Sequence, residues 1–122
     1  MTQPLALVLY EKLLPGTQLA GRLQDLGWRV QTLNDASELS RAAEEHKPLL
    51  VLADLVAARA SVIDSIGALR RNQTIAHIPV IAFSADESQH QPAVDAGATL
   101  AVSDTAILQH LNQFIDQALN EF

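Results

Sequence analysis

Cysteine is absent from this chain of 122 residues. Its absence excludes a disulfide scaffold, a thiolate zinc site and a cysteine nucleophile, and is compatible with a reducing compartment. Long apolar runs are also missing, because none approaches the ~20 residues that a membrane-spanning helix requires. The N-terminal residues lack the basic region of a secretory signal. We therefore expect a cytoplasmic protein without a membrane segment.

Positive charge is scarce as well. The chain has 8 Lys and Arg against 14 Asp and Glu, which gives a formal net charge of -6. We expect no binding to nucleic acid, because neutralisation of phosphates dominates such affinity. No Gly-x-Gly-x-x-Gly motif follows the first apolar segment, which disfavours a dinucleotide site. No ligand spacing suited to zinc is shared by the four histidines, which are His46, His77, His90 and His110.

Hydrophobic residues make up 48% of the chain, enough for the core of one domain over residues 1–122. Short apolar segments alternate with stretches of helical periodicity. The apolar segments predict five strands, at residues 5–9, 28–33, 48–54, 78–83 and 99–102. The periodic stretches predict five helices, which follow the strands in turn. The first starts near Thr17, has Leu19, Leu23 and Leu26 on one face and ends at Gly27. The second, third and fifth extend over about residues 35–45, 62–71 and 104–119, and the fourth is a short helix that ends at Ala96 and has Pro92 at its start or in its first turn.

This alternation predicts an α/β domain of three layers, with a parallel sheet between two layers of helices. We expect the flavodoxin-like strand order 2-1-3-4-5, in which strands 1 and 3 are neighbours. Ligands of such sheets bind at the carboxyl ends of the strands. The buried strand 48–54 ends there in a carboxylate, Asp54. The predicted crevice also receives four other residues, Tyr10, Glu11, Ser84 and Asp104.

Over essentially its whole length, the chain resembles a response-regulator receiver domain of two-component signalling. The segment Pro48–Asp54 resembles the family's phosphoacceptor strand and places Asp54 at the phosphorylated position. The segment Ile78–Ala85 resembles the strand that ends in the family's Thr/Ser-Ala, so that Ser84 takes the place of the phosphoryl-contacting hydroxyl. Ala96-Gly97-Ala98 resembles the Ala-Gly-Ala that precedes the family's last strand.

Several family positions are altered. Tyr10 and Glu11 stand where receivers have two adjacent acids that help to hold Mg²⁺. Asp104 stands where the family has a lysine that contacts the acyl phosphate, and Ala101 replaces the aromatic switch residue. Two unit charges ~4 Å apart interact by roughly 4 kcal/mol at an effective dielectric of 20, so a carboxylate in place of the lysine disfavours a phosphoryl group. An alternative role for Asp104 is the N-cap of the last helix.

We therefore predict an acidic pocket of Glu11, Asp54 and Asp104, with no lysine or arginine beside Asp54. A basic side chain in that place would overturn this prediction. Mg²⁺ is the cofactor that the resemblance implies, with Glu11 and Asp54 as its ligands. If all three acids share one crevice, their mutual repulsion raises at least one pKa.

Three functions follow as hypotheses. The first is a stand-alone, degenerate receiver, or pseudo-receiver, which is not an enzyme and signals by binding a histidine kinase or another signalling protein. Its exposed candidates are Gln109, Gln113 and Gln117. The second is a working receiver that a histidine kinase phosphorylates on Asp54 with Mg²⁺. The third, an unrelated flavodoxin-like enzyme or cofactor binder, lacks the motifs that it requires.

Overall fold

The computed structural model describes residues 3–57 and 60–120. Its centre is a five-stranded parallel sheet in the order β2-β1-β3-β4-β5, as predicted. The strands are β1 (Leu5–Leu9), β2 (Arg29–Leu33), β3 (Leu50–Asp54), β4 (Val80–Phe83) and β5 (Leu100–Val102). Every residue of β3 and β4 is buried, whereas β2 is an edge strand with exposed residues. The continuous apolar runs of the sequence are therefore the central strands, which helices cover on both faces.

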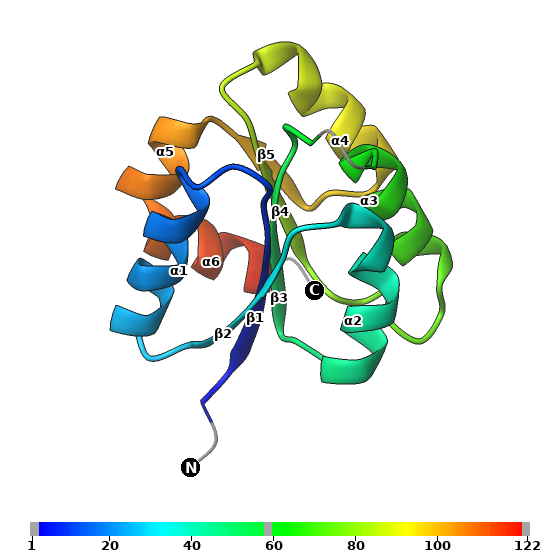
Figure 1. Cartoon of the computed structure of the whole chain (residues 1–122), viewed down its shortest axis with the longest axis horizontal. Coiled ribbons are helices and arrows are strands. Elements are labelled where there is room, and N and C mark those ends of the chain that lie inside the picture. The colour runs from blue at the N-terminus through cyan, green and yellow to red at the C-terminus, as the bar shows by residue number, and fades with distance from the viewer. Residues whose placement is uncertain (1–2, 58–59, 121–122) are drawn as a thin grey trace.

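Helices cover both faces of the sheet (Figure 1). One layer consists of α1 (Gly16–Asp25), α5 (Asp104–Gln109) and α6 (Leu111–Leu119). The other consists of α2 (Leu39–His46), α3 (Val62–Arg71) and α4 (His90–Ala96), and two 3-10 turns, η1 (Ala36–Glu38) and η2 (Glu87–Gln89), precede α2 and α4. Buried side chains form one apolar cluster on each face of the sheet. The carboxyl ends of the strands meet along the upper edge in Figure 1.

Two sequence predictions about the helices were wrong. The last helix is two helices rather than one, because the backbone of His110 leaves the helical region at φ -126°. Both pieces still pack on the same core, through Ile107 of α5 and Ile115 of α6 among others. Leu26 was predicted to share one helix face with Leu19 and Leu23, which are buried, but it is 47% exposed. It follows the last turn of α1, which ends as predicted before Gly27 at φ +91°.

A half-buried arginine joins several segments at the amino-terminal edge of the sheet. The guanidinium of Arg70, at the end of α3, donates hydrogen bonds to the carbonyl oxygens of Gly97, Ala76 and Ile78 and to the hydroxyl of Thr99. Thr99 in turn accepts a bond from the backbone N–H of the first residue of β4. Arg70 thus joins α3 to the loops that lead into β4 and β5.

In residues 3–57 and 60–120, the helices are too short or too polar to cross a lipid bilayer.

Candidate functional site

Asp54 is the last residue of β3 and is almost completely buried, with 1% of its surface exposed. The backbone N–H of Val56 donates a 2.9 Å hydrogen bond to Asp54 Oδ1, and this bond fixes the carboxylate. The other oxygen, Oδ2, is also buried but has no hydrogen-bond partner among the described residues. Native proteins satisfy most buried polar atoms, so an orphaned carboxylate oxygen calls for an explanation.

Within residues 3–57 and 60–120, the positive charge beside this oxygen is the ammonium of Lys12. Lys12 lies in the loop between β1 and α1, and its Nζ is 3.9 Å from Asp54 Oδ2. The same ammonium is 3.8 Å from Asp104 Oδ2, so it lies between the two carboxylates. The side chain of Lys12 is 41% exposed, whereas that of Asp54 is fully buried. Lys12 therefore covers Asp54 from the solvent side.

Asp104 reaches the pocket from the first residue of α5. The hypothesis that Asp104 caps this helix was wrong, because the N-cap is Ser103, whose hydroxyl accepts a hydrogen bond from the backbone N–H of Ala106. Asp104 Oδ1 is buried and, within the described part of the chain, has no hydrogen-bond partner. Since Ser103 provides the cap, the Asp104 carboxylate is available to pair with Lys12.

The charges around Asp54 act in opposite directions. Burial raises its pKa above the usual value of 3.8, and this is the largest effect. The hydrogen bond from Val56 and the ammonium of Lys12 lower the pKa, whereas the carboxylates of Asp104 and Glu11 raise it. The net result is a raised pKa. Burial is its main cause, and the predicted repulsion from the neighbouring acids is a smaller contribution.

Glu11 and Tyr10 also line a cavity of about 330 Å³ toward β2 and α2. Thr32, Asn34 and Glu38 are among its other lining residues. The Tyr10 ring lies over Gly16, at a place where a Cβ atom would be 2.2 Å from the ring, so only glycine fits there. Tyr10 therefore packs against the start of α1, while Glu11 is close enough to Asp54 to raise its pKa.

Ser84 is fully buried at the end of β4. Its hydroxyl accepts a hydrogen bond from the backbone N–H of Asp86, and its carbonyl oxygen accepts one from His90 Nε2. Both bonds stabilise the loop into α4. The structure thus places Ser84 at the predicted edge of the sheet and gives its side chain a loop-stabilising contact.

The prediction that no basic side chain lies beside Asp54 was wrong. Lys12 is in that place. The sequence prediction considered a positive charge only at the family's lysine position after strand 5, where Asp104 stands. It gave no role to Lys12 in the loop after strand 1. A signal was present, because Lys12 follows β1 by three residues and the ends of β1 and β3 are adjacent. A long side chain at that point reaches across to the neighbouring strand.

The geometry around Asp54 does not suit the Mg²⁺ site that the resemblance implies. Asp54 Oδ2 is the oxygen that remains for a metal, because Oδ1 accepts the bond from Val56. The ammonium of Lys12 is 3.9 Å from that oxygen and would repel a divalent cation bound there. No group of three or more His, Asp or Glu side chains suited to a metal ion occurs in residues 3–57 and 60–120. With Lys12 in this position, the residues present do not fit Mg²⁺.

Neither a protein-family model nor a curated protein matches the chain. Solved structures match it closely in three dimensions. The receiver domain of the sensor histidine kinase PA1611 of Pseudomonas aeruginosa, described with a magnesium ion in its active-site cleft, has a TM-score of 0.88 at 17% identity. That match covers 98% of this chain and 100% of the other.

Two further structures support the same fold. A putative response regulator of Chloroflexus aurantiacus has a TM-score of 0.88 at 15% identity, over 97% of this chain and 98% of the other. The chemotaxis response regulator CheY4 of Vibrio cholerae has a TM-score of 0.77 at 18% identity, over 92% of this chain and 98% of the other. At these identities the similarity establishes architecture and not activity. The chain has the flavodoxin-like fold of response-regulator receiver domains.

Proposed function

We propose that this chain is a receiver-like signalling domain of a two-component or phosphorelay system, and that it acts by binding a protein partner rather than by accepting a phosphoryl group. The partner is a histidine kinase or another signalling protein, and the site of action is the cytoplasm. In this proposal the domain is not an enzyme.

One observation supports this proposal: the single lysine of the pocket already lies between two carboxylates. A phosphoryl group on Asp54 would replace the single negative charge of the carboxylate by roughly two negative charges beside Asp104, and it would share Lys12 with Asp104. At ~4 Å and an effective dielectric of 20, each unit of like charge costs roughly 4 kcal/mol. Among residues 3–57 and 60–120, the two carboxylates of Asp54 and Asp104 thus share the ammonium of Lys12, and a phosphoryl group would add further negative charge to this pair.

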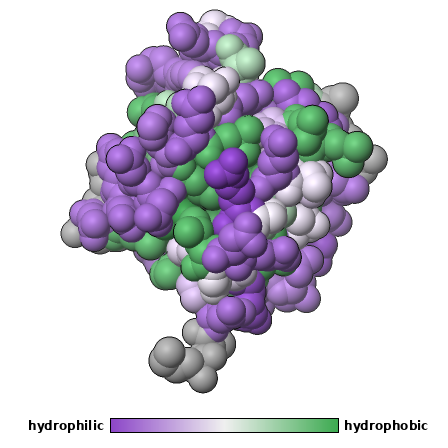
Figure 2. Space-filling model, turned by 90° about the vertical axis from the view of Figure 1, so that its left-hand side faces the viewer, coloured by the Kyte–Doolittle hydropathy of each residue, from purple (hydrophilic) through white to green (hydrophobic). Residues whose placement is uncertain are grey.

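The surface offers a place for a partner on the face of α1, α5 and α6. Figure 2 looks onto this face, where hydrophobic residues lie among hydrophilic ones. A groove of about 360 Å³ between α1 and α5 is lined by Leu14, Pro15 and Leu108 among others. Leu14 is 58% exposed and its neighbour Leu13 is 76% exposed, so two large apolar side chains are accessible at the start of this groove. The glutamines predicted to be solvent-facing, Gln109, Gln113 and Gln117, are all exposed.

A specific observation favours the second candidate function, phosphorylation of Asp54. Its Oδ2 atom has no hydrogen-bond partner among the described residues, and a lysine that could contact an anion lies 3.9 Å away. A carboxylate in this arrangement is a candidate nucleophile. The two functions differ in whether the pocket reacts with a phosphodonor.

Intact-protein mass spectrometry separates them. The protein is incubated with acetyl phosphate, with and without Mg²⁺, beside an ordinary receiver domain that becomes labelled under the same conditions. We expect no added phosphoryl mass on this chain. A mass increase that disappears in Asp54→Ala would establish the second function and reject the first.

The partner-binding surface has its own test. A candidate histidine kinase from the same organism is titrated against the wild-type chain, Leu14→Asp and Val94→Asp. Val94 is the matched control, because it is 42% exposed on α4, in the opposite helix layer. We expect Leu14→Asp to weaken binding at least tenfold and Val94→Asp to leave it within twofold. Equal effects of the two variants would reject this surface.

A further inference from the structure

We infer that Lys12 is the resident cation of the pocket and occupies the place of a divalent metal ion, so that its ammonium excludes Mg²⁺ from the pocket. This inference deepens the proposed function and rests on it for the role of the pocket as a non-reacting site. It concerns the binding of a cation, which is measured separately from phosphorylation.

The first argument is position. Lys12 Nζ is within 4 Å of the buried Oδ2 of Asp54 and of Oδ2 of Asp104, which come from two different strand ends. A group that contacts carboxylates from two loops is placed as a bridging cation would be. Glu11 adds a third carboxylate in the electrostatic range of Asp54. The pocket therefore has the negative charge that a cation requires, and a lysine meets part of it.

Two carboxylate oxygens of the pocket lack hydrogen-bond partners among the described residues. They are Asp54 Oδ2 and Asp104 Oδ1, and both are buried. Both are hard carboxylate oxygens, and both belong to residues that Lys12 contacts. Mg²⁺ binds through one or two such carboxylates and retains several waters. Removing the ammonium would therefore leave a site whose chemistry suits Mg²⁺, and the lysine is what excludes the ion.

The third argument is the exchange of charges between two loops. The receiver domains that this chain resembles have acids after strand 1 and a lysine after strand 5. Here the loop after β1 provides the lysine, Lys12, and the residue after β5 and its cap is an acid, Asp104. The charges of Lys12 and Asp104 are thus opposite in sign to those at the corresponding family positions. The positive charge lies in the loop where the resemblance places the acids that help to hold Mg²⁺.

The test is a calorimetric titration of the chain with Mg²⁺ alone. We expect Lys12→Met to bind Mg²⁺ at least tenfold more tightly than the wild-type chain, because a methionine keeps the length of the side chain and removes its charge. The double variant Lys12→Met/Asp54→Asn should lose this gain. The matched control is Lys47→Met, which removes the only other lysine of the sequence, an exposed one at the end of α2.

Three outcomes would overturn the inference: equal Mg²⁺ affinity of the wild-type chain and Lys12→Met, an equal gain in Lys47→Met, or a gain that survives Asp54→Asn. Thermal unfolding of each variant with and without Mg²⁺ provides a second measurement, and a Mg²⁺-dependent rise in melting temperature is expected for Lys12→Met alone. Failure of this inference leaves the labelling experiment unaffected. Conversely, acetyl phosphate labelling of the wild-type chain would reject the proposed function whatever the Mg²⁺ affinities.

Discussion

Each of the two edges of the sheet has a basic side chain, but the surroundings of these two side chains differ. At the amino-terminal edge, Arg70 donates to three backbone carbonyls and one hydroxyl. At the carboxyl-terminal edge, Lys12 lies near two carboxylates at almost 4 Å, and each of these acids has a buried oxygen without a hydrogen-bond partner among the described residues. The first arrangement stabilises the fold. The second reduces stability, and such a cost is typical of functional sites.

Removing the arginine should have the largest effect. Arg70→Ala leaves the carbonyl oxygens of Gly97, Ala76 and Ile78 without this donor, and hydrogen bonds to charged groups contribute more than neutral ones. We expect the free energy of unfolding in urea to fall by about 2–4 kcal/mol. The control is Arg71→Ala, an exposed arginine of the same helix turn, with a change under about 0.5 kcal/mol. A loss below about 1 kcal/mol for Arg70→Ala would remove the contrast between the edges.

Neutralising the buried acid should stabilise the protein. In Asp54→Asn the Val56 bond is kept, because an amide oxygen accepts it as well, while the buried charge is removed. We expect the free energy of unfolding at pH 7 to rise, because burial disfavours the charged carboxylate and the amide carries no charge.

The pH dependence of this difference has a definite sign. Because the pKa of Asp54 is raised in the folded state, that state holds more protons than the unfolded chain between 3.8 and the raised pKa. Wild-type stability therefore increases relative to Asp54→Asn as the pH falls through the raised pKa, and levels off below 3.8. Urea unfolding of both proteins between about pH 3 and pH 7 measures this difference. A variant less stable than wild type at pH 7 would mean that attraction to Lys12 outweighs burial.

Two neighbouring substitutions distinguish capping from pocket charge. Ser103→Ala removes the N-cap bond to Ala106 and should cost about 1 kcal/mol. Asp104→Ala removes no cap and relieves repulsion with Asp54, so we expect a change under about 0.5 kcal/mol. Thermal or urea unfolding of both variants measures this difference. If Asp104→Ala cost as much as Ser103→Ala, Asp104 would be part of the cap after all.

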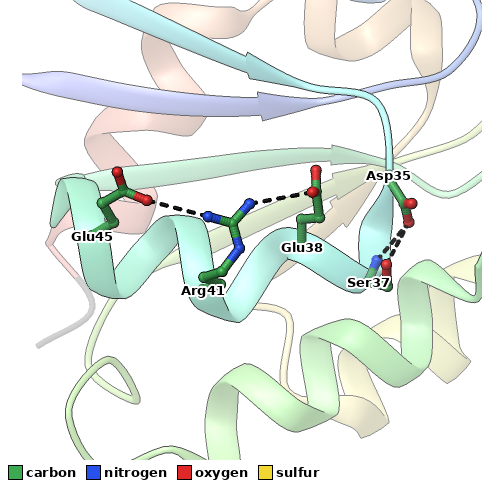
Figure 3. A network of polar contacts seen from close by, with 5 residues as sticks. All are labelled: Asp35, Ser37, Glu38, Arg41 and Glu45. Carbon is green, nitrogen blue, oxygen red and sulfur yellow. Dashed lines mark hydrogen bonds and ion pairs between the residues drawn. The ribbon is translucent and has the colours of Figure 1, made fainter.

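The smallest effect is expected at an exposed ion-pair network away from both edges (Figure 3). Arg41 on α2 pairs with Glu38 at 3.2 Å and with Glu45 at 3.3 Å. Exposed pairs of this kind contribute little, so Arg41→Ala should change the free energy of unfolding by less than about 0.5 kcal/mol. Urea unfolding in low and high salt checks this value. A loss above about 1 kcal/mol would show that surface pairs must be included in any comparison of the two edges.

Much of the fold was predictable because its signals are local. The apolar run before Asp54 indicated a strand buried on both faces, and β3 is fully buried. Asp35 was predicted to open a helix, and its carboxylate accepts the backbone N–H of Ser37. The break at His110 was missed because the apolar periodicity continues through it on the same face.

The pocket was predictable only in part. Strand order placed Asp54 and Asp104 at one edge, and the structure brings both within 4 Å of one ammonium. The role of Lys12 was missed because a flexible lysine can reach several places from its loop, and its sequence position does not select one. Ser103 was missed as a cap because Asp104 beside it is an equally good capping residue type.

The sequence by itself determined the alternation of strands and helices, the parallel sheet and the end of β3 at a carboxylate, because these depend on hydrophobic periodicity and burial along the chain. Only the tertiary structure decided which side chain balances that carboxylate. Asp54, Lys12 and Asp104 are far apart in sequence and meet because three loops end at one edge of the sheet. Electrostatic pairing depends on distance in space, and that distance is set by the folded chain.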